Sequence, residues 1–411
     1  MDSRWDSRTA NRMNNIKAST IRGLLKLTEM PDVISFAGGL PAPEIFPHNE
    51  FNAACTKVLQ EKCAVALQYG TTGGYTPLRE YIAEHNHLGL KVSPDNIIIT
   101  SGAQQALDLV GRSYINEGDK ILVESPTYLG ALQAWNAYGV QYLPTLIDND
   151  GIIPEEFEKN IQQGAKFAYL QPNFHNPTGV SISLERREKI IRIADKHGFP
   201  IIEDDPYGQL CFDVEPTKSF LKLDSEYRSC FGEYCGDIMY LGTFSKVLAP
   251  GMRIAYVIAP LSVIGKINLS KQGADLHTAT FNQVVVYETI KGGFIDEHVR
   301  EIRAVYKHRR DIMLEALEEY MPKGITWTHP YGGLFIWAFF PEDVDTTALL
   351  EYAIAEKVAF VPGEQFYPGE VKAKNAMRLN FSNANPDKIV EGIQRLLRSY
   401  EKYLVQISAV V

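Results

Sequence analysis

Lys246 is the residue of this sequence with the clearest potential for covalent chemistry. It lies in the segment Thr243-Phe244-Ser245-Lys246, directly after an apolar stretch that is typical of a buried strand. A lysine at the carboxyl end of a buried strand can have a lowered pKa, and its neutral amine can then form an imine with an aldehyde. The hydroxyls of Thr243 and Ser245 and the guanidinium of Arg253 suit a phosphate dianion. A solvated surface loop would explain one isolated lysine better, so the interpretation depends on the other segments.

An acidic segment, Glu203-Asp204-Asp205-Pro206-Tyr207, follows another apolar stretch. Asp204 would end a strand, and a carboxylate at such a depth needs a cationic or hydrogen-bonding partner. A protonated pyridine nitrogen is one such partner, and this pairing keeps an aromatic ring electron-withdrawing. Tyr207 lies three residues further on and can donate to a phenolate oxygen of the same ring. Considered alone, a turn or helix cap made by the Asp-Asp-Pro residues is an equally good explanation.

Three further polar positions follow predicted strands. Asn176, in the segment Asn176-Pro177-Thr178-Gly179, can point its amide at a ring oxygen and at a substrate carboxylate, although a plain turn also explains these residues. The segment from Thr100 to Gln105 leads into a helix, and the amides at a helix N-terminus bind anions. Tyr128 can stack on an aromatic cofactor or belong to the core. His175 is interpreted as a packing or loop residue.

Arg378 stands inside an apolar segment, Met377-Arg378-Leu379-Asn380-Phe381. A charge in such a strand is costly unless it is paired. Bidentate binding of the α-carboxylate of a substrate accounts for it. An internal ion pair is the alternative.

Short apolar segments alternate with helical ones from about residue 90 to about residue 260. We predict strands at residues 96–100, 120–124, 141–147, 167–171, 200–204, 237–243 and 252–259, and helices at residues 102–115, 129–138 and 184–197. This alternation indicates an α/β fold with a mainly parallel sheet sandwiched by helices. Ligands of such sheets bind beyond the carboxyl ends of the strands, where the polar segments described above fall.

Long helices are predicted from about residue 260 to about residue 320, and a smaller α+β unit follows. Its predicted strands are residues 333–340, 358–361 and 378–381. We therefore expect an N-terminal segment at residues 1–45, a large domain at residues 46–320 and a small domain at residues 321–411, with a cleft between the two domains.

Composition excludes several classes of protein. The 411 residues carry a net charge of −9, which argues against nucleic acid or an anionic membrane as a partner. No apolar run reaches the roughly 20 residues that span a bilayer, and the polar N-terminus is unlike a secretory signal. These features predict a cytoplasmic protein.

The five cysteines suit a reducing compartment. Cys230 and Cys235 bracket a short loop, but without a nearby histidine or further cysteine they make a poor zinc site, and we predict no metal. We expect these two to be free thiols. A loop disulfide is the alternative if the host is hyperthermophilic.

Taken together, these segments resemble the class I/II aminotransferases of the fold-type I pyridoxal 5′-phosphate (PLP) superfamily. The resemblance extends from about residue 20 to about residue 400. Three motifs are specific in combination: Asn176-Pro-Thr-Gly, Asp204-x-x-Tyr207, and Ser245-Lys246 followed by Arg253. Within the class, the chain looks most similar to the kynurenine/2-aminoadipate group, which includes aromatic and multi-substrate aminotransferases. The segments that carry this closer resemblance are residues 34–41, 66–69, 203–207 and 280–283.

The resemblance implies an enzyme that moves the amino group of an L-amino acid, aromatic or like 2-aminoadipate, to a 2-oxo acid, with 2-oxoglutarate expected. Lys246 would form the imine with PLP, and Asp204 would pair with the pyridine nitrogen. Asn176 and Tyr207 would bind the ring oxygen, and Tyr128 would stack on the ring. The phosphate would be held by Ala103 (through its backbone amide), Gln104, Thr243, Ser245 and Arg253.

The same resemblance implies a homodimer with shared active sites, because Tyr69 would reach the phosphate in the neighbouring subunit. Gly39, Asn176 and Arg378 would receive the α-carboxylate of the substrate. Arg22 matches a segment that covers the site in this family, and it could pair with an acidic substrate side chain. A solvated helix residue is an equal alternative for Arg22.

Two other functions compete with amino transfer. A β-lyase or a decarboxylase can use the same fold and the same carboxylate clamp at Arg378, since fold does not fix reaction. A ligand-sensing regulator of the MocR type is the remote alternative. Such regulators carry an N-terminal DNA-binding module, whereas only about 20 residues precede the first match in this acidic chain.

Overall fold

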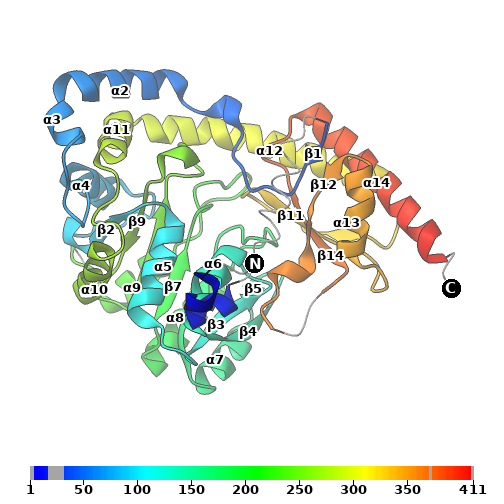
Figure 1. Cartoon of the computed structure of the whole chain (residues 1–411), viewed down its shortest axis with the longest axis horizontal. Helices are drawn as coiled ribbons and strands as arrows, with labels where there is room; N and C mark the ends of the chain where they lie inside the picture. The colour runs from blue at the N-terminus through cyan, green and yellow to red at the C-terminus, as the bar shows by residue number, and fades with distance from the viewer. Residues whose placement is uncertain (1–3, 17–31, 231, 370–372, 409–411) are drawn as a thin grey trace.

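A sheet of eight strands forms the centre of the larger part of the molecule (Figure 1). The computed structural model describes residues 4–16, 32–230, 232–369 and 373–408. In sheet order the strands are β2 (Ile97–Thr100), β9 (Ala255–Ile258), β8 (Ile238–Thr243), β7 (Ile201–Asp204), β6 (Ala165–Leu170), β3 (Lys120–Ser125), β4 (Gln141–Asp148) and β5 (Gly151–Ile152). Strand β9 is antiparallel to both of its neighbours and β5 to β4, while the pairs from β8 to β4 are parallel. The predicted mainly parallel α/β sheet is therefore confirmed.

Alternate residues of each central strand pack against different helices. Ile202 faces the core under α5 (Ala103–Tyr114), α6 (Leu129–Trp135) and α10 (Leu261–Gln272). Its neighbour Ile201 faces the core under α7 (Pro154–Gln162), α8 (Leu184–His197) and α9 (Phe220–Arg228). Because side chains alternate with a period of two along a strand, a sheet covered on both faces needs continuous apolar runs such as Ile97–Ile99. The apolar strands recognised in the sequence reflect this double burial.

A smaller antiparallel sheet forms the second domain. Its strands are, in order, β10 (Thr326–Trp327), β11 (Phe335–Phe339), β14 (Ala376–Asn380) and β13 (Val361–Pro362). Helices α13 (Thr346–Ala355) and α14 (Pro386–Ser408) pack together beside it. Strand β1 (Ile34–Ser35) pairs with β12 (Val358–Ala359), so the chain before the large sheet joins this domain.

The remaining helices lie along one edge of the molecule (Figure 1). They are α2 (His48–Glu61), α3 (Cys63–Ala66), α4 (Thr76–His85) and α11 (Thr280–Ile290). Helix α12 (Phe294–Tyr320) then runs from α11 to α14 and links the two domains. No helix in the described ranges is long and apolar enough to cross a membrane.

The expectation of two free thiols in the loop before β8 is wrong. Cys230 and Cys235 form a disulfide, with their Cα atoms 5.9 Å apart. The chain turns back here because the backbone N–H of Cys230 bonds to Ser225 and the N–H of Tyr234 bonds to Asn96. This turn, which is set by a contact with Asn96 immediately before β2, brings the two cysteines within bridging distance. Among the described residues, no group of histidine, cysteine and acidic side chains is arranged to hold a metal ion.

Candidate active site

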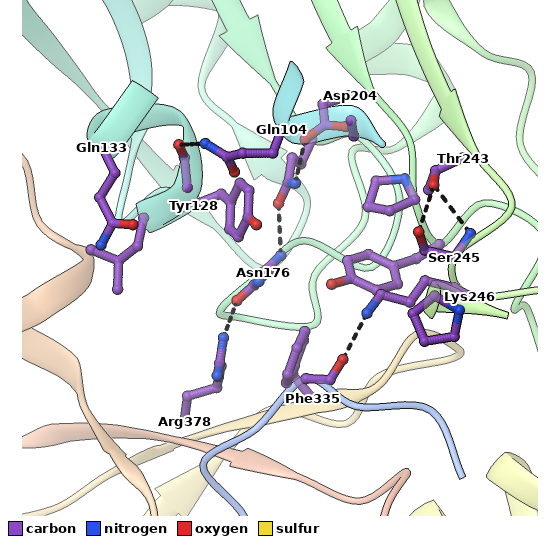
Figure 2. A pocket seen from close by; sticks show the side chains of 18 of the residues that line it. Gln104, Tyr128, Gln133, Asn176, Asp204, Thr243, Ser245, Lys246, Phe335 and Arg378 are labelled. Atoms are coloured by element: carbon purple, nitrogen blue, oxygen red, sulfur yellow. Dashed lines mark hydrogen bonds between the residues drawn. The ribbon is translucent and has the colours of Figure 1, made fainter. Parts of the chain in front are cut away.

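A cavity of about 340 Å³ lies between the carboxyl ends of the large sheet and the small domain (Figure 2). Its lining contains all of the site residues expected from the sequence except Tyr69 and Arg22. These lining residues are Gly39, Ala103, Gln104, Tyr128, Asn176, Asp204, Tyr207, Thr243, Ser245, Lys246, Arg253 and Arg378. The cavity thus brings together residues separated by more than 300 positions of the chain.

Lys246 follows β8 and points into this cavity. Its Nζ donates a hydrogen bond to the backbone oxygen of Gly39 at 2.7 Å. Burial lowers the pKa of Lys246 to about 8, and the charges of Arg378 and Arg253 act in the same direction. About a fifth of the amine is therefore neutral near physiological pH, far more than for an ordinary lysine, and the neutral form is the one that acts as a nucleophile or base.

Three consecutive acids at the end of β7 have three different roles. Glu203 accepts hydrogen bonds from the first backbone N–H groups of α9, at Phe220 and Leu221, both at 2.8 Å. Asp205 points away from the cavity into a buried polar network. Only Asp204 lines the cavity, because side chains alternate along the strand and the following turn directs Asp205 elsewhere.

Asp204 is held by one of its two carboxylate oxygens. Its Oδ2 accepts hydrogen bonds from the hydroxyl of Tyr169 at 2.6 Å and from Nε2 of Gln171 at 2.9 Å. Its Oδ1 is buried and has no hydrogen-bond partner among the described residues. Burial raises the pKa of Asp204 to about 6, against the effect of these two donors. Such an oxygen is suited to a hydrogen-bond donor supplied by a bound ligand, and a cationic donor would also stabilise the ionised carboxylate.

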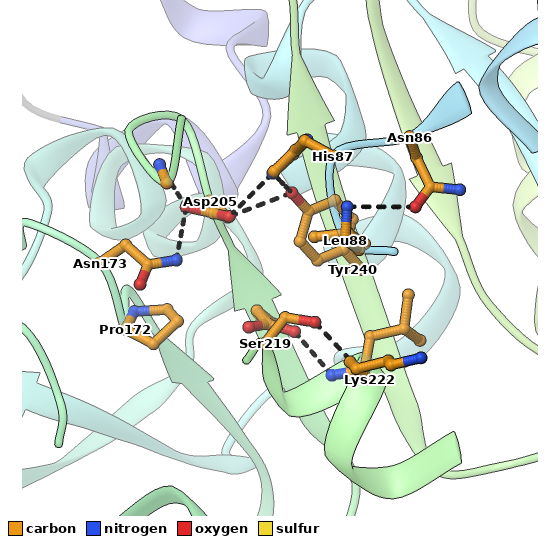
Figure 3. A network of polar contacts seen from close by, with 12 residues as sticks. Asn86, His87, Leu88, Pro172, Asn173, Asp205, Ser219, Lys222 and Tyr240 are labelled. Carbon is orange, nitrogen blue, oxygen red and sulfur yellow. Dashed lines mark hydrogen bonds and ion pairs between the residues drawn. The ribbon is translucent and has the colours of Figure 1, made fainter. Parts of the chain in front are cut away.

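Asp205 forms hydrogen bonds with the loop that carries Asn176 and with the turn that carries Tyr207. Figure 3 shows Asp205 with its neighbours Asn173, His87 and Tyr240. Its Oδ1 accepts from Nδ2 of Asn173 at 2.9 Å and from the backbone N–H of Gly208 at 2.8 Å. Its Oδ2 accepts from the hydroxyl of Tyr240 at 3.1 Å, with Nε2 of His87 3.5 Å away. The hydrogen bonds and the charge of His87 lower the pKa of Asp205 against its burial, which acts to raise it. The network fixes the spacing between the two loops.

Arg378 is 3% exposed and lies in β14. Its guanidinium is 4.3 Å from the ring centroid of Phe335 and donates to Oδ1 of Asn176 at 2.7 Å. It also donates to the backbone oxygen of Ala37 at 2.6 Å, whereas its Nε has no hydrogen-bond partner among the residues that the structure describes. No carboxylate within the described ranges pairs with it, so the alternative of an internal ion pair is not seen. A guanidinium in this setting is suited to an anionic ligand.

The N-terminus of α5 forms a cradle with no room for a side chain. Gly102 has a φ of +83°, and a Cβ placed there would lie 2.0 Å from Nη2 of Arg253. Nearby, the backbone N–H of Ser245 donates to Oγ1 of Thr243 at 3.1 Å, and that hydroxyl donates to Oγ of Ser245 at 3.0 Å. Helix amides, hydroxyls and a guanidinium therefore converge on one point, as an anion site requires.

Several cavity residues were missed in the sequence, namely Leu129, Gly130, Gln133, Gln171, Pro206, Pro250 and Phe335. Gln171 directly follows β6, so the rule that located Asp204 at the end of β7 also applied to it. Phe335 lies inside an apolar strand and gave no such signal. Tyr69 is exposed in this single chain and contacts His277 edge-on, away from the cavity. Arg22 lies outside the described residues.

A family model described as "Aminotransferase class I and II" matches residues 45–396. The chain belongs to this family. It is similar to the aromatic-amino-acid aminotransferase 1 of Thermococcus litoralis, with 46% identity over 395 residues, 94% of this chain and 92% of the relative. It is also similar to the 2-aminoadipate transaminase of Thermus thermophilus, with 40% identity over 401 residues, 97% of this chain and 98% of the relative.

A solved structure of an aminotransferase has the same fold. The kynurenine aminotransferase of Pyrococcus horikoshii, in complex with pyridoxamine phosphate, superposes with a TM-score of 0.90 at 42% identity. The match covers 98% of this chain and 99% of that structure. The protein is therefore a PLP-dependent aminotransferase. The cavity fits the cofactor, because it combines a lysine of lowered pKa, a carboxylate oxygen with no partner in the described part of the chain, and a cradle for a phosphate.

Proposed function

We propose that this aminotransferase takes the amino group from aromatic L-amino acids and from 2-aminoadipate and transfers it to 2-oxoglutarate. The observation that carries the proposal is the joint placement of Lys246, Asp204 and Arg378 around one cavity. The names of the relatives from Thermococcus and Thermus support the two classes of donor. Arg378 holds the α-carboxylate, which every amino acid has, so the choice among amino acids depends on the residues that contact the substrate side chain.

Lys246 has two roles in this proposal. When PLP is bound, it supplies an aldehyde for the lysine amine and a ring that withdraws electrons from the substrate. Nζ of Lys246 would hold the cofactor through its aldehyde in the absence of substrate. When substrate is bound, the freed amine is the base that takes the proton from Cα of the substrate, and its lowered pKa suits this exchange near neutral pH.

Asn176 and Tyr207 face the oxygen of the cofactor ring. Arg378 can only donate hydrogen bonds, so the Asn176 oxygen must face it and Nδ2 of Asn176 remains to donate elsewhere. Burial raises the pKa of Tyr207, which keeps its hydroxyl protonated as a second donor. Asp204 would accept a hydrogen bond from the ring nitrogen and keep it protonated, and Tyr128 would stack on the ring.

The phosphate is held by Ala103, Gln104, Thr243, Ser245 and Arg253, and by Tyr69 from a second subunit. Tyr69 is 79% exposed in the single chain, which leaves its ring accessible to a partner. We further propose that the working enzyme is a homodimer and that it is cytoplasmic. Gly39, Asn176 and Arg378 receive the substrate carboxylate.

Absorption spectra of the purified protein with single amino acids, and without any oxo acid, test this function. A visible band that fades with phenylalanine or 2-aminoadipate and returns with 2-oxoglutarate supports the proposal. Release of ammonia or carbon dioxide while the band persists would replace it with a β-lyase or a decarboxylase. Sedimentation of the loaded protein at twice the monomer mass supports the dimer.

Arg22 is proposed to pair with acidic substrate side chains. Arg22→Ala is then expected to lower kcat/KM for 2-aminoadipate by about ten- to hundredfold, because one charged hydrogen-bonded pair is lost. The value for phenylalanine should change little. Steady-state kinetics with both donors checks this, and an equal loss for both would contradict a role in side-chain selection.

The rate at which the apoprotein takes up PLP is expected to depend on pH with a midpoint near 8. Only the neutral amine of Lys246 can attack the aldehyde, and burial lowers its pKa to about 8. The rate should therefore rise about tenfold per pH unit below this value and level off above it. Stopped-flow absorbance measures the rate, and a midpoint near that of free lysine would show that the amine is solvated.

A further inference from the structure

Gln171 forms hydrogen bonds with two residues of the cavity lining, Asp204 and Asn176, both of which are labelled in Figure 2. It follows β6 directly, and it is 1% exposed. Its Nε2 donates to Oδ2 of Asp204 at 2.9 Å, and its Oε1 accepts from the backbone N–H of Asn176 at 3.2 Å. Asp204 is assigned to the ring nitrogen and Asn176 to the ring oxygen. The buried amide of Gln171 therefore contacts both the residue assigned to the ring nitrogen and the residue assigned to the ring oxygen.

The two partners determine which way this amide points. The Asp204 carboxylate, when ionised, can only accept, and the Asn176 backbone N–H can only donate. Glutamine satisfies both, whereas leucine satisfies neither and an ionised glutamate would oppose the Asp204 charge. Together with Tyr169, the amide occupies Oδ2 of Asp204, and Oδ1 is left without a hydrogen-bond partner among the described residues. The direction of the free oxygen is thus set by these two donors.

The backbone of Gln171 is also fixed by a hydrogen bond. Its backbone N–H donates to Oε2 of Glu124 at 2.8 Å, and Glu124 lies in β3 with its side chain 1% exposed. Nε2 of His175 lies 3.5 Å from the same oxygen, and the other ring nitrogen is 2.9 Å from Oγ1 of Thr178. The anchor therefore joins β3, β6 and the loop that carries Asn176. A side chain fixed at its backbone in this way can transmit position to its two partners.

We propose that Gln171 is a positioning residue that fixes the Asp204 carboxylate and the Asn176 loop relative to each other, so that the ring nitrogen and the ring oxygen can be bound at the same time. The proposal rests on the proposed function, and it assigns a role to a residue outside the motifs described above. It makes two separate predictions, one for the removal of the amide and one for its replacement by an acid.

Gln171→Leu is expected to lower kcat by about ten- to hundredfold, as the loss of supporting residues does at other sites, with a smaller change in KM. The visible band of the PLP-loaded protein should change with pH at a higher midpoint than in the wild type. The reason is that a less firmly protonated ring nitrogen withdraws fewer electrons from the bond between Lys246 and the cofactor. A purely structural role would leave this midpoint unchanged.

Gln171→Glu provides the sharper test, because it keeps the shape of the side chain. A protonated glutamate can still donate to Asp204 and accept from Asn176, whereas an ionised one repels Asp204. The variant should approach wild-type kcat at acid pH and lose activity relative to the wild type as pH rises. Tyr169→Phe, which removes one hydroxyl from Asp204, should shift the midpoint in the same direction as Gln171→Leu.

Asn160→Leu is the matched control. Asn160 is also a buried amide with two acceptors, the backbone oxygen of Pro144 and Oγ1 of Thr145, but it lies in α7 outside the cavity lining. It should lower the melting temperature without moving the band. If Gln171→Leu behaves like this control, and Gln171→Glu has a wild-type pH profile, the positioning role is overturned. A wild-type protein that transfers no amino group would instead overturn the proposed function.

Discussion

Lys246→Ala is expected to reduce kcat by about 10⁴-fold or more with every amino donor. The substitution removes the group that holds the cofactor and the base that moves the Cα proton, and a positioned base alone contributes about 10²- to 10⁴-fold. The anion cradle and Asp204 are untouched, so the protein should still bind PLP, without the shifted spectrum that the lysine produces. Single-turnover absorbance with phenylalanine measures the loss.

The fold should tolerate this change. The side chain of Lys246 is partly buried, and its amine makes one hydrogen bond, to the backbone of Gly39. Removing a partly desolvated cation of lowered pKa relieves a desolvation cost, so the melting temperature of the apoprotein should stay the same or rise. Lys196→Ala, at an exposed lysine of α8 whose partner is Glu158, is the control that should leave activity unchanged. Transamination by Lys246→Ala at the wild-type rate would refute the assignment of the site.

The sequence was most informative for site residues whose position follows directly from the strand that they end or follow. Asp204 and Lys246 were located because each follows a continuous apolar run, which predicts a buried strand, and ligands bind at the carboxyl ends of such strands. The double burial of the sheet made these runs long enough to recognise. The helix at residues 184–197 was predicted with its observed bounds because its apolar positions repeat with helical spacing.

Contacts between distant segments could not be read in this way. The hydrogen bond from Arg378 to Asn176 joins residues 202 positions apart, and only the packing of the small domain against the large sheet brings them together. The same holds for the disulfide, since its loop closes through a contact between Tyr234 and Asn96. The role of Gln171 could not be predicted either, because a glutamine that follows a strand can equally lie at the protein surface. The pattern locates polar residues but does not choose their partners.

Asp204→Asn is expected to lower kcat by about 10²- to 10³-fold. The amide still accepts at one atom, but it carries no charge to hold the proton on the ring nitrogen. Breaking a buried ion pair costs about 3–5 kcal/mol, and each factor of ten in rate corresponds to about 1.4 kcal/mol. The amide must also place either its oxygen or its NH₂ group toward Tyr169 and Gln171, both of which donate to Oδ2 in the wild type. Steady-state kinetics measures the loss in kcat, and the pH midpoint of the visible band should rise.

Glu203→Gln provides the matched comparison one residue away. Burial raises the pKa of Glu203 to about 8, so this group is largely protonated at neutral pH and an amide changes its charge little. Because the side chain holds the first N–H groups of α9 and does not line the cavity, the variant should lose some thermal stability while kcat stays within about twofold. If both variants lose activity equally, the effect at Asp204 comes from disturbing β7. A loss confined to Asp204→Asn shows that the charge on this one carboxylate supports the chemistry.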